Sequence, residues 1–368
     1  MYDYLIVGGG LFGATFAYLA RKANKSVLIV EKKPVLGGGI RSERRDNIDI
    51  HLYGPHIFHT SDKEVWDFVC SLVKMNNFIN EPLAEYKGKR YHLPFNMNTF
   101  VDMWGINNPE EAKAKIEEQV KEANIKEITN LEEQALSMIG KDLYETLIKG
   151  YTEKQWGKAC NELPPEIIKR LPVRFTFDNN YFNDIYQGIP VEGYTDLIDK
   201  LTAEADVLIN TNYFDKKNEL DKKAKHIIYT GEIDRYYDYI YGHLEYRTLR
   251  FEIKKIDKPS YQGHAVINYT EREVPYTRIA EHKYFNYRES PVTYITYEYP
   301  KLYEEGDDPY YPVNNEKNKA LYNQYKDLAD KESNVSFAGR LGSYQYFDMD
   351  DTIRAAMNLF EKLKNKNC

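Results

Sequence analysis

A glycine-rich turn near the start of the chain is the first feature that could do chemistry. The pattern Gly8-x-Gly10-x-x-Gly13 follows an apolar run over 2–7 and opens a stretch of helical periodicity over 11–23. The first glycine of such a turn permits the tight bend, the second lets the backbone approach a pyrophosphate, and the third lets the helix pack on the sheet. Amide groups of the first helical turn then face the phosphates. We therefore predict dinucleotide contacts at Gly8, Gly10, Leu11, Phe12 and Gly13.

An acidic residue stands where a dinucleotide site requires one. Glu31 follows a second apolar run over 26–30, roughly 20 residues after the glycine turn, and Lys32 comes next. At the end of a strand, the carboxylate of Glu31 can hold a ribose hydroxyl. This motif by itself does not separate NAD from FAD.

Two further segments favour FAD over NAD. The triplet Gly37-Gly38-Gly39 comes soon after the second strand, as it does in the glutathione-reductase-like flavoproteins. Near the other end of the chain, 337–340 and 348–350 lead into a helix, and this is similar to the C-terminal return by which those proteins contact the flavin. We expect cofactor contacts at Gly38, Gly39, Gly339, Asp348 and Met349.

Other residues argue against metal, nucleic-acid and membrane functions. His56 and His59 are spaced like a pair of metal ligands, but no third ligand stands at a suitable spacing, so we predict no metal site. The three cysteines are far apart in the chain, which fits a reducing cytoplasm. The net charge is −7 without a basic block. No stretch reaches the roughly 18 apolar residues of a membrane span. We therefore expect neither nucleic acid nor a membrane as a partner.

The elements that position these residues follow from hydrophobic periodicity. Strands are predicted over 2–7, 26–30, 226–229 and 335–338. Amphipathic helices are predicted over 62–74 and 315–331, and from about Asp350 onward. The stretch 109–148 is helical with a break at Gly140, and 85–93 is a hairpin. Alternating residues predict an antiparallel sheet over 246–299.

This order of elements predicts an α/β protein. We expect a Rossmann-like (glutathione-reductase-like) FAD-binding domain with an inserted helical domain and an antiparallel β-sheet domain. The FAD-binding domain is discontinuous, over 1–78, 186–234 and 332–368. The helical domain is expected over 96–165, and the sheet or substrate domain over 79–95, 166–185 and 235–331.

Five blocks of the sequence together resemble the bacterial UDP-galactopyranose mutases, and the likeness covers essentially the whole chain. Their aromatic and arginine content is not expected of a generic flavin oxidase. The blocks are Gly54–His59, Gly150–Gly157, Lys169–Phe175, Asp178–Phe182 and Gly339–Asp350.

The resemblance implies an isomerase, a ring-contracting mutase that interconverts UDP-galactopyranose and UDP-galactofuranose. It implies FAD that is active when reduced, with flavin N5 as the nucleophile at the anomeric carbon and no net redox change. It also implies a cytoplasmic homodimer in cell-surface polysaccharide biosynthesis, supplied by an external reductant (NAD(P)H or a reductase). Whether UDP-N-acetylgalactosamine is also a substrate stays open.

The resemblance also assigns residues to the substrate. An arginine fork binds phosphate oxygens in pairs and stays charged when buried, so it suits a diphosphate that leaves and returns. Arg170 and Arg278 are expected on the diphosphate and Arg340 beside the flavin and sugar, while Arg247 is either a support or a surface charge. Tyr151 is expected to stack on uracil. Further expected substrate contacts are Thr152, Trp156, Tyr181, Asn268, Tyr311, Tyr346 and Asp348.

Arg278, Arg340 and His59 are the expected catalytic residues. In the family the loop with the two histidines runs against the flavin, so His59 is expected to contact or tune the ring system. His56 is either a second cofactor contact or a structural histidine. Trp156 is expected on a loop, and the segment 156–170 is expected to move when substrate binds.

One departure concerns Leu147 and Ile148, where some bacterial members carry phenylalanine near the uridine. Base packing is therefore expected to be aliphatic on that side.

Two other functional classes stay open. A flavin oxidoreductase that transfers hydride has the same FAD motifs, but its substrate would bleach the oxidised flavin. A non-catalytic binding protein on the same fold, such as the GDP-dissociation inhibitors, would not require Glu31 or the intact glycine turn.

Overall fold

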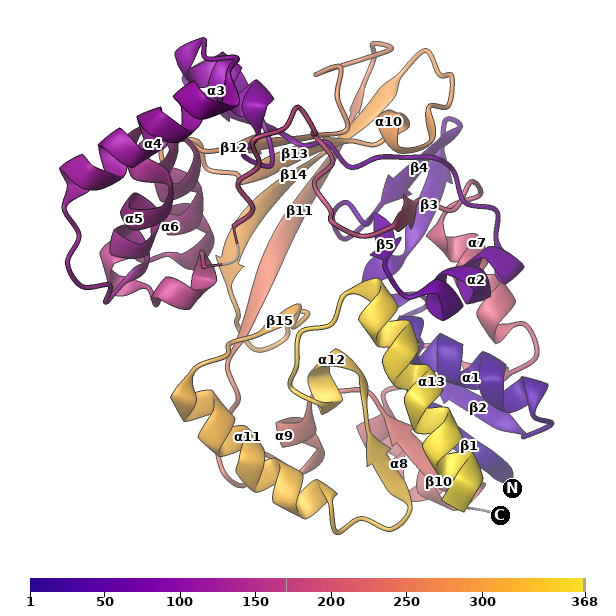
Figure 1. Cartoon of the computed structure of the whole chain (residues 1–368). Coiled ribbons are helices and arrows are strands. Elements are labelled where there is room, and N and C mark those ends of the chain that lie inside the picture. Colours follow the sequence, from indigo (N-terminus) through magenta and orange to yellow (C-terminus); the bar gives the residue numbers. More distant parts are fainter. Residues whose placement is uncertain (170, 367–368) are drawn as a thin grey trace.

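A parallel sheet organises the first and last parts of the chain, as seen in a computed structural model that describes residues 1–169 and 171–366 (Figure 1). Its five strands stand in the order β16-β10-β1-β2-β9, and all neighbours are parallel. They are β1 (Tyr2–Val7), β2 (Val27–Val30), β9 (Asp206–Leu208), β10 (Ala224–Tyr229) and β16 (Val335–Phe337). The predicted strands near 2–7, 26–30, 226–229 and 335–338 are thus confirmed.

Both faces of this sheet are covered, as the continuous apolar runs of its strands require. On one face, α1 (Leu11–Lys22) packs beside α13 (Met349–Lys366), which Figure 1 shows in yellow. Phe16 and Phe360 meet edge to face there, with ring centroids 5.8 Å apart. Tyr213 and Leu220 cover the other face, from η5 (Tyr213–Lys216) and α8 (Lys217–Leu220). The Rossmann-like α/β prediction is therefore confirmed.

A second sheet of seven strands has the order β15-β11-β14-β13-β12-β6-β7. All neighbours are antiparallel except β12 and β6. The strands are β6 (Leu83–Tyr86), β7 (Lys89–His92), β11 (Tyr246–Ile256), β12 (Val266–Tyr269), β13 (Arg278–Glu281), β14 (Thr293–Leu302) and β15 (Tyr311–Pro312). Its register places Asn268 opposite Arg278, and Arg278 opposite Glu298, so these polar side chains share one face.

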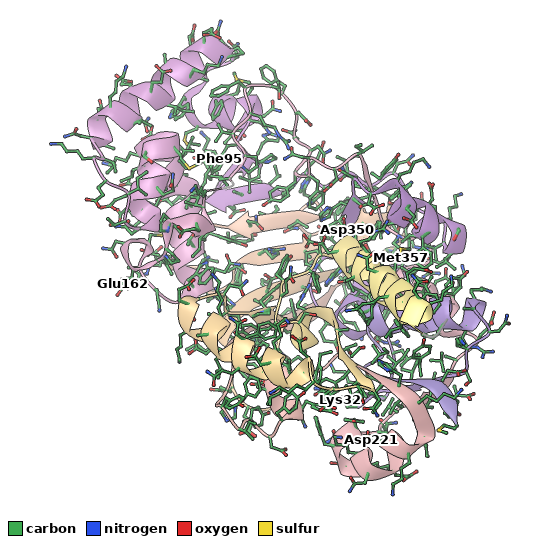
Figure 2. The ribbon with its side chains drawn as sticks, turned by 60° about the horizontal axis from the view of Figure 1, so that its bottom comes forward. Lys32, Phe95, Glu162, Asp221, Asp350 and Met357 are labelled. Carbon is green, nitrogen blue, oxygen red and sulfur yellow. The ribbon has the colours of Figure 1, made fainter. Side chains whose placement is uncertain are left out.

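A helical unit lies beside one end of this sheet (Figure 1, magenta). It comprises α3 (Met97–Trp104), α4 (Pro109–Ala123), α5 (Leu131–Leu143), η2 (Tyr144–Lys149) and α6 (Gly150–Trp156). Asn96, Asn108 and Asn130 each accept backbone N–H bonds at a helix start. The predicted break at Gly140 is a kink inside α5, where φ is 76°. Phe95, labelled in Figure 2, is buried in the apolar cluster of this unit.

Shorter elements connect these units. Two two-stranded sheets pair β3 (Ser42–Arg45) with β4 (Ile48–His51) and β5 (Phe58–Thr60) with β8 (Tyr186–Gly188). The remaining helices of more than three residues are α2 (Lys63–Leu72), α7 (Tyr194–Thr202), α9 (Ile233–Tyr236), α10 (Lys283–Asn286), α11 (Glu316–Ala329) and α12 (Gly339–Gly342). The three-residue turns are η1 (Gly38–Ile40), η3 (Cys160–Glu162), η4 (Pro165–Ile167) and η6 (Asp221–Lys223).

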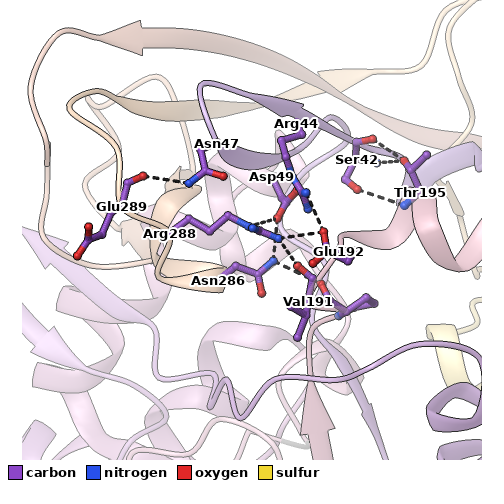
Figure 3. Close-up of polar contacts among 11 residues, drawn as sticks. Ser42, Arg44, Asn47, Asp49, Val191, Glu192, Thr195, Asn286, Arg288 and Glu289 are labelled. Carbon is purple, nitrogen blue, oxygen red and sulfur yellow. Dashed lines mark hydrogen bonds and ion pairs between the residues drawn. The ribbon is translucent and has the colours of Figure 1, made fainter.

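A buried carboxylate fixes β4 to the segment after β13 (Figure 3). The side chain of Asp49 is 4% exposed and accepts hydrogen bonds from Nε of Arg44 at 2.7 Å and from Nε of Arg288 at 3.0 Å. Asn286 donates to it as well, over 3.1 Å. Glu192 pairs with both arginines from the loop before α7. Because two guanidinium groups compensate the charge of Asp49, the three segments are held in one arrangement.

We propose that the three predicted domains correspond to these units. The helical unit has an apolar cluster of its own, and the parallel sheet has one on each face. Another apolar cluster joins the proposed FAD-binding domain to the seven-stranded sheet, where Phe58 and Ile198 pack with Val266, Ala280 and Phe285. Within residues 1–169 and 171–366, no helix combines the length and apolar character needed to cross a membrane.

Candidate active site

A cavity of about 910 Å³ lies where the parallel sheet, the helical unit and the seven-stranded sheet meet. Residues from both ends and the middle of the chain line it. The predicted site residues among them are Gly8, Gly10, Leu11, Phe12, Glu31, Lys32, Gly38, Gly39, His56, His59, Tyr151, Thr152, Trp156, Tyr181, Asn268, Arg278, Tyr311, Gly339, Arg340, Tyr346, Asp348 and Met349. The structure therefore brings into one space residues that the sequence predicts for cofactor and for substrate.

Two predicted residues that the structure describes, Gly13 and Arg247, do not line the cavity. Gly13 lies behind the glycine turn, where a Cβ would come within 2.2 Å of the carbonyl oxygen of Gly8. Arg247 contacts the ring of Trp156, which does line the cavity. Arg170 lies outside the described residues.

The glycine turn leaves room for a pyrophosphate at the start of α1. Gly8 has a φ of +106°, and a Cβ there would lie 2.2 Å from Oγ1 of Thr230. A Cβ on Gly38 would lie 3.1 Å from Cα of Gly10, so the two glycine segments approach closely. Gly10 caps α1 without a side-chain hydrogen bond, and the first turn holds no acidic residue. The amides and the positive helix end are thus available to an anion, and the residues fit a dinucleotide.

Glu31 is held beside the same turn. Its buried carboxylate accepts hydrogen bonds from the backbone N–H groups of Gly9 and Lys33, each over 2.8 Å. A carboxylate accepts about four hydrogen bonds, so lone pairs remain for a ribose hydroxyl.

Lys33 links this end of the cavity to a distant segment. Its Nζ donates to Oδ2 of Asp308 over 2.6 Å and lies 4.8 Å from the ring centroid of Tyr53. Burial acts to lower the pKa of Lys33, but Asp308 outweighs it and the pKa is raised. Lys33, Tyr53 and Asp308 all line the cavity, and sequence reasoning missed all three.

The two predicted histidines are oriented differently. Nδ1 of His59 lies 2.8 Å from Oδ2 of Asp184, and its ring stacks on Phe182 with centroids 3.7 Å apart. Nδ1 of His56 lies 2.9 Å from the carbonyl oxygen of Gly54, so it carries the proton and leaves Nε2 as an acceptor. Burial lowers the pKa of His56 to about 4, so this ring is neutral at neutral pH.

Arg278 is a charged group prepared for a ligand. Its Nε lies 3.4 Å from Oε1 of Glu298, and its Nη2 donates to the hydroxyl of Tyr151 over 3.3 Å. Burial acts to lower the pKa of Arg278, but Glu298 and Tyr151 outweigh it and the pKa is raised. Oδ1 of the neighbouring Asn268 is buried and has no hydrogen-bond partner in the part of the chain that the structure describes. Both residues line the cavity, so Arg278 brings a cation to its wall.

Arg340 is oriented by carbonyl groups. Nη1 donates to the carbonyl oxygen of Tyr310 over 2.9 Å, and Nη2 donates to that of Phe347 over 2.6 Å. Its guanidinium carbon lies 5.4 Å from the ring centroid of Tyr311 and 5.0 Å from that of Tyr346. Because no carboxylate takes part in these contacts, the charge of Arg340 is left for an anionic ligand.

Trp156 ends a helix and does not lie on a loop, so that expectation is wrong. The helix α6 continues from η2 and stops at Trp156 because Gly157 takes up the left-handed conformation, with a φ of 64°. Nζ of Lys154 donates to the carbonyl oxygens of Tyr269 over 2.7 Å and of Tyr276 over 2.9 Å, which anchors α6 on the sheet. The expected movement of 156–170 stays a prediction.

Sequence reasoning missed several residues around the cavity. Glu298 could have been found from strand alternation, since β14 places it opposite Arg278. Asn80, which also lines the cavity, and Asp184 stand in connecting segments without a recognisable motif.

Comparison with known proteins identifies the family. A family model described as UDP-galactopyranose mutase matches residues 146–346, and an NAD(P)-binding Rossmann-like domain model matches residues 6–72. A probable UDP-galactopyranose mutase of Klebsiella pneumoniae is 42% identical over 359 residues, covering 96% of this chain and 93% of that one. The chain belongs to the UDP-galactopyranose mutase family.

Other relatives widen the picture of this family. A dTDP-fucopyranose mutase of Escherichia coli is 38% identical, covering 97% of both chains. The UDP-galactopyranose mutase of Mycoplasma genitalium is 32% identical, covering 98% of this chain and 95% of its own. A crystal structure of reduced UDP-galactopyranose mutase matches the fold with a TM-score of 0.73 at 13% identity, covering 99% of this chain and 96% of that one. The protein is therefore an isomerase of this family, with a fold found in flavin enzymes.

Proposed function

We propose that this enzyme interconverts UDP-galactopyranose and UDP-galactofuranose with FAD bound along the glycine turn. One observation carries the proposal: a single cavity joins the Gly8–Gly13 turn and Glu31 to Arg278 and Arg340. The first group suits a dinucleotide cofactor, and the second suits the diphosphate of a nucleotide sugar. Family membership supports this pairing of cofactor and substrate.

The chain's own residues would hold the cofactor in the oxidised and the reduced state. The N-terminus of α1 and the glycine turn would bind its pyrophosphate, and Glu31 would bind a ribose hydroxyl. Bound reduced FAD would supply the nucleophile, its N5 atom, at the anomeric carbon without net redox change. His59 and His56 line the same cavity, and the neutral His56 adds no charge there.

The arginines would hold the diphosphate while it leaves and returns. The five N–H donors of each guanidinium can follow the phosphate oxygens, and the contacts from carbonyl groups limit how far Arg340 turns. Arg278 would stay charged throughout because Glu298 raises its pKa together with Tyr151. The hydroxyl group of Tyr311 would add a neutral donor, while that of Tyr346 donates to Oδ1 of Asp348 over 2.7 Å. The protein thereby supplies orientation and charge rather than a nucleophilic side chain.

The nucleobase would lie at the end of the cavity formed by the helical unit. Tyr151 and Trp156 offer aromatic faces there, and Leu147 and Ile148 offer aliphatic ones. An aliphatic wall accepts uracil and the methyl group of thymine by the same contacts. The competing substrate is therefore a dTDP-sugar, in line with the dTDP-fucopyranose mutase among the relatives.

The experiment is chromatographic separation of the two UDP-galactose isomers after incubation with purified protein, either oxidised or reduced with dithionite. Interconversion in the reduced sample alone is the expected result. UDP-N-acetylgalactosamine and dTDP-fucopyranose are run in parallel. Faster turnover of dTDP-fucopyranose would replace the proposed substrate, while bleaching of oxidised flavin by a substrate would support a hydride-transferring oxidoreductase instead.

We further propose a cytoplasmic homodimer that receives electrons from NAD(P)H or a reductase and feeds cell-surface polysaccharide biosynthesis. The absence of a second nucleotide-binding glycine motif in the sequence supports an external reductant. Analytical ultracentrifugation and flavin reduction by NADPH, with and without cell extract, test these two points.

A further inference from the structure

Two buried histidines form a chain of hydrogen bonds that ends on the cavity wall. The backbone N–H of His56 donates to Nδ1 of His51 over 3.1 Å. The backbone N–H of His51 donates in turn to Nδ1 of His282 over 3.2 Å. Nε2 of His282 lies 2.6 Å from Oγ1 of Thr296. His51 and His282 are each only 1% exposed, and they belong to none of the sequence motifs of the site.

These bonds determine which nitrogen of each ring carries the proton. Both Nδ1 atoms accept a hydrogen bond, so a neutral ring must carry its proton on Nε2. His282 can donate that proton to Thr296, whereas Nε2 of His51 is buried without a hydrogen-bond partner within 1–169 and 171–366. Burial lowers the pKa of both rings, that of His282 to about 3. Nε2–H of His51 is thus a buried donor without a partner, which is rare in folded proteins. It is explained by Nδ1 of the same ring, which must stay unprotonated to accept the bond from His56.

The backbone of His56 is held at both of its peptide groups. Its N–H bonds to His51, and its carbonyl oxygen accepts from the hydroxyl of Tyr194 over 2.9 Å. The ring of His51 stacks on Phe285 with centroids 4.7 Å apart and meets the ring of Tyr194 edge to face. His56 itself lines the cavity, and the charges of Arg278 and Arg340 act on its ring. A shift of this peptide would therefore move the cavity wall.

The segments that carry His51 and His282 are held together by a buried ion pair. His51 ends β4, which also carries Asp49, and His282 begins the segment that carries Asn286 and Arg288. Asp49 binds both of the latter residues, so β4 and the 282–288 segment cannot separate without breaking a buried ion pair (Figure 3). The network of Figure 3 thus holds the two imidazoles in register.

We propose that His51 and His282 are positioning residues: as neutral hydrogen-bond acceptors they set the orientation of the His56 peptide, and with it the cavity wall against which the cofactor lies. This inference rests on the proposed function in so far as FAD is the cofactor. It concerns residues that touch neither cofactor nor substrate, so they act through His56 alone.

The test compares two substitutions that differ in one acceptor. In His51→Asn, Oδ1 stands close to the position of Nδ1 and can accept from His56, whereas His51→Leu offers no acceptor. We expect His51→Leu to shift the absorption maximum and the reduction potential of the bound flavin and to lower kcat roughly tenfold. His51→Asn should restore all three values toward those of the wild type. Tyr325→Phe is the control, since it loses a buried hydrogen bond to the carbonyl oxygen of Gly242 and neither residue lines the cavity.

The second measurement needs no variant enzyme to be active. Nitrogen-15 NMR of the histidine-labelled holoenzyme should show Nδ1 unprotonated and Nε2 protonated in His51 and His282 at neutral pH. The opposite tautomer in either ring would overturn the proposal, and so would equal losses in His51→Leu and His51→Asn. If the wild type fails to interconvert UDP-sugars, the proposed function falls, while the flavin spectra and the NMR signals still decide on the two histidines.

Discussion

Arg247 stacks on Trp156, with its guanidinium carbon 4.2 Å from the centroid of the indole ring. Arg247 lies in β11 of the seven-stranded sheet, and Trp156 ends α6 of the helical unit. Burial lowers the pKa of Arg247. Trp156 lines the cavity, so Arg247 restrains an aromatic side chain of the cavity wall.

Arg247→Ala should therefore weaken UDP binding although the residue does not line the cavity. Loss of a partly buried cation–π contact lets the indole ring move, and we expect Kd to rise roughly three- to tenfold. Titration calorimetry with UDP measures this. Arg250→Ala is the matched control. Arg250 lies in β11 like Arg247, and its guanidinium carbon is 3.8 Å from the ring centroid of Tyr299, but neither Arg250 nor Tyr299 lines the cavity. Equal effects of the two substitutions would contradict a role for Arg247 in nucleotide binding.

Arg278→Ala should nearly abolish turnover while flavin stays bound, because the diphosphate loses a partly buried cation. The substitution also leaves the carboxylate of Glu298 buried without its partner, which costs about 3–5 kcal/mol of stability. Arg278→Ala combined with Glu298→Gln should recover much of that stability but none of the turnover. Thermal unfolding and the isomerisation assay separate the two effects. Recovery of turnover in the double variant would remove Arg278 from the catalytic group.

Gly13→Ala should yield a folded protein that retains little cofactor. A Cβ at this position would approach the carbonyl oxygen of Gly8 to 2.2 Å, so the helix and the glycine turn must separate. The helix itself should remain, since alanine favours helices over glycine. Flavin content per chain and circular dichroism after purification measure the two quantities. Wild-type flavin content would show that the turn is not the pyrophosphate site.

Asp308→Asn should speed the loss of cofactor, because Lys33 then holds the 303–310 segment less tightly over the cavity. Both side chains are partly exposed, at 29% and 35%, so we expect the dissociation rate to rise only about two- to fivefold. Asp307→Asn is the control, since Asp307 pairs with Lys301 at 2.8 Å and does not line the cavity. Flavin fluorescence after dilution gives the rate. Identical rates in both variants would show that the Lys33–Asp308 ion pair does not slow the loss of cofactor.

The free energy of unfolding should fall as the pH drops from about 6.5 toward 4. Burial lowers the pKa of His56 to about 4 and of His282 to about 3, and the pKa of His51 also lies well below its usual value. In this range the unfolded chain therefore binds more protons than the folded chain. Each such histidine lowers the free energy of unfolding by up to about 1.4 kcal/mol per pH unit as the pH falls.

His282→Asn should remove one proton from this pH dependence. Around His282 stand the neutral His51, Phe285 and Thr296, while Arg278, Arg340 and Asp348 act on His56. Urea unfolding between pH 4 and 7.5 gives the slope. A slope unchanged in this variant would mean that His282 is protonated in the folded protein.

The sequence by itself determined the parts whose physical requirement is local. Gly8, Gly10 and Gly13 have the spacing of a dinucleotide phosphate turn, and Glu31 follows the second strand at the position typical of a ribose contact. Apolar runs gave the strands, because a parallel sheet buried on both faces needs continuous apolar residues. The resemblance to the mutases indicated Arg278 and Arg340, and both line the cavity.

Only the tertiary structure decided which distant residues meet. The bond from the backbone of His51 to His282 spans 231 positions of the chain, and that from Lys33 to Asp308 spans 275. No local pattern predicts such pairs, because their geometry depends on how the two sheets and the helical unit pack together. The same limit of local sequence patterns applies to Trp156. Its neighbours in the chain suggested a loop, but Trp156 ends a helix that Lys154 anchors on the seven-stranded sheet.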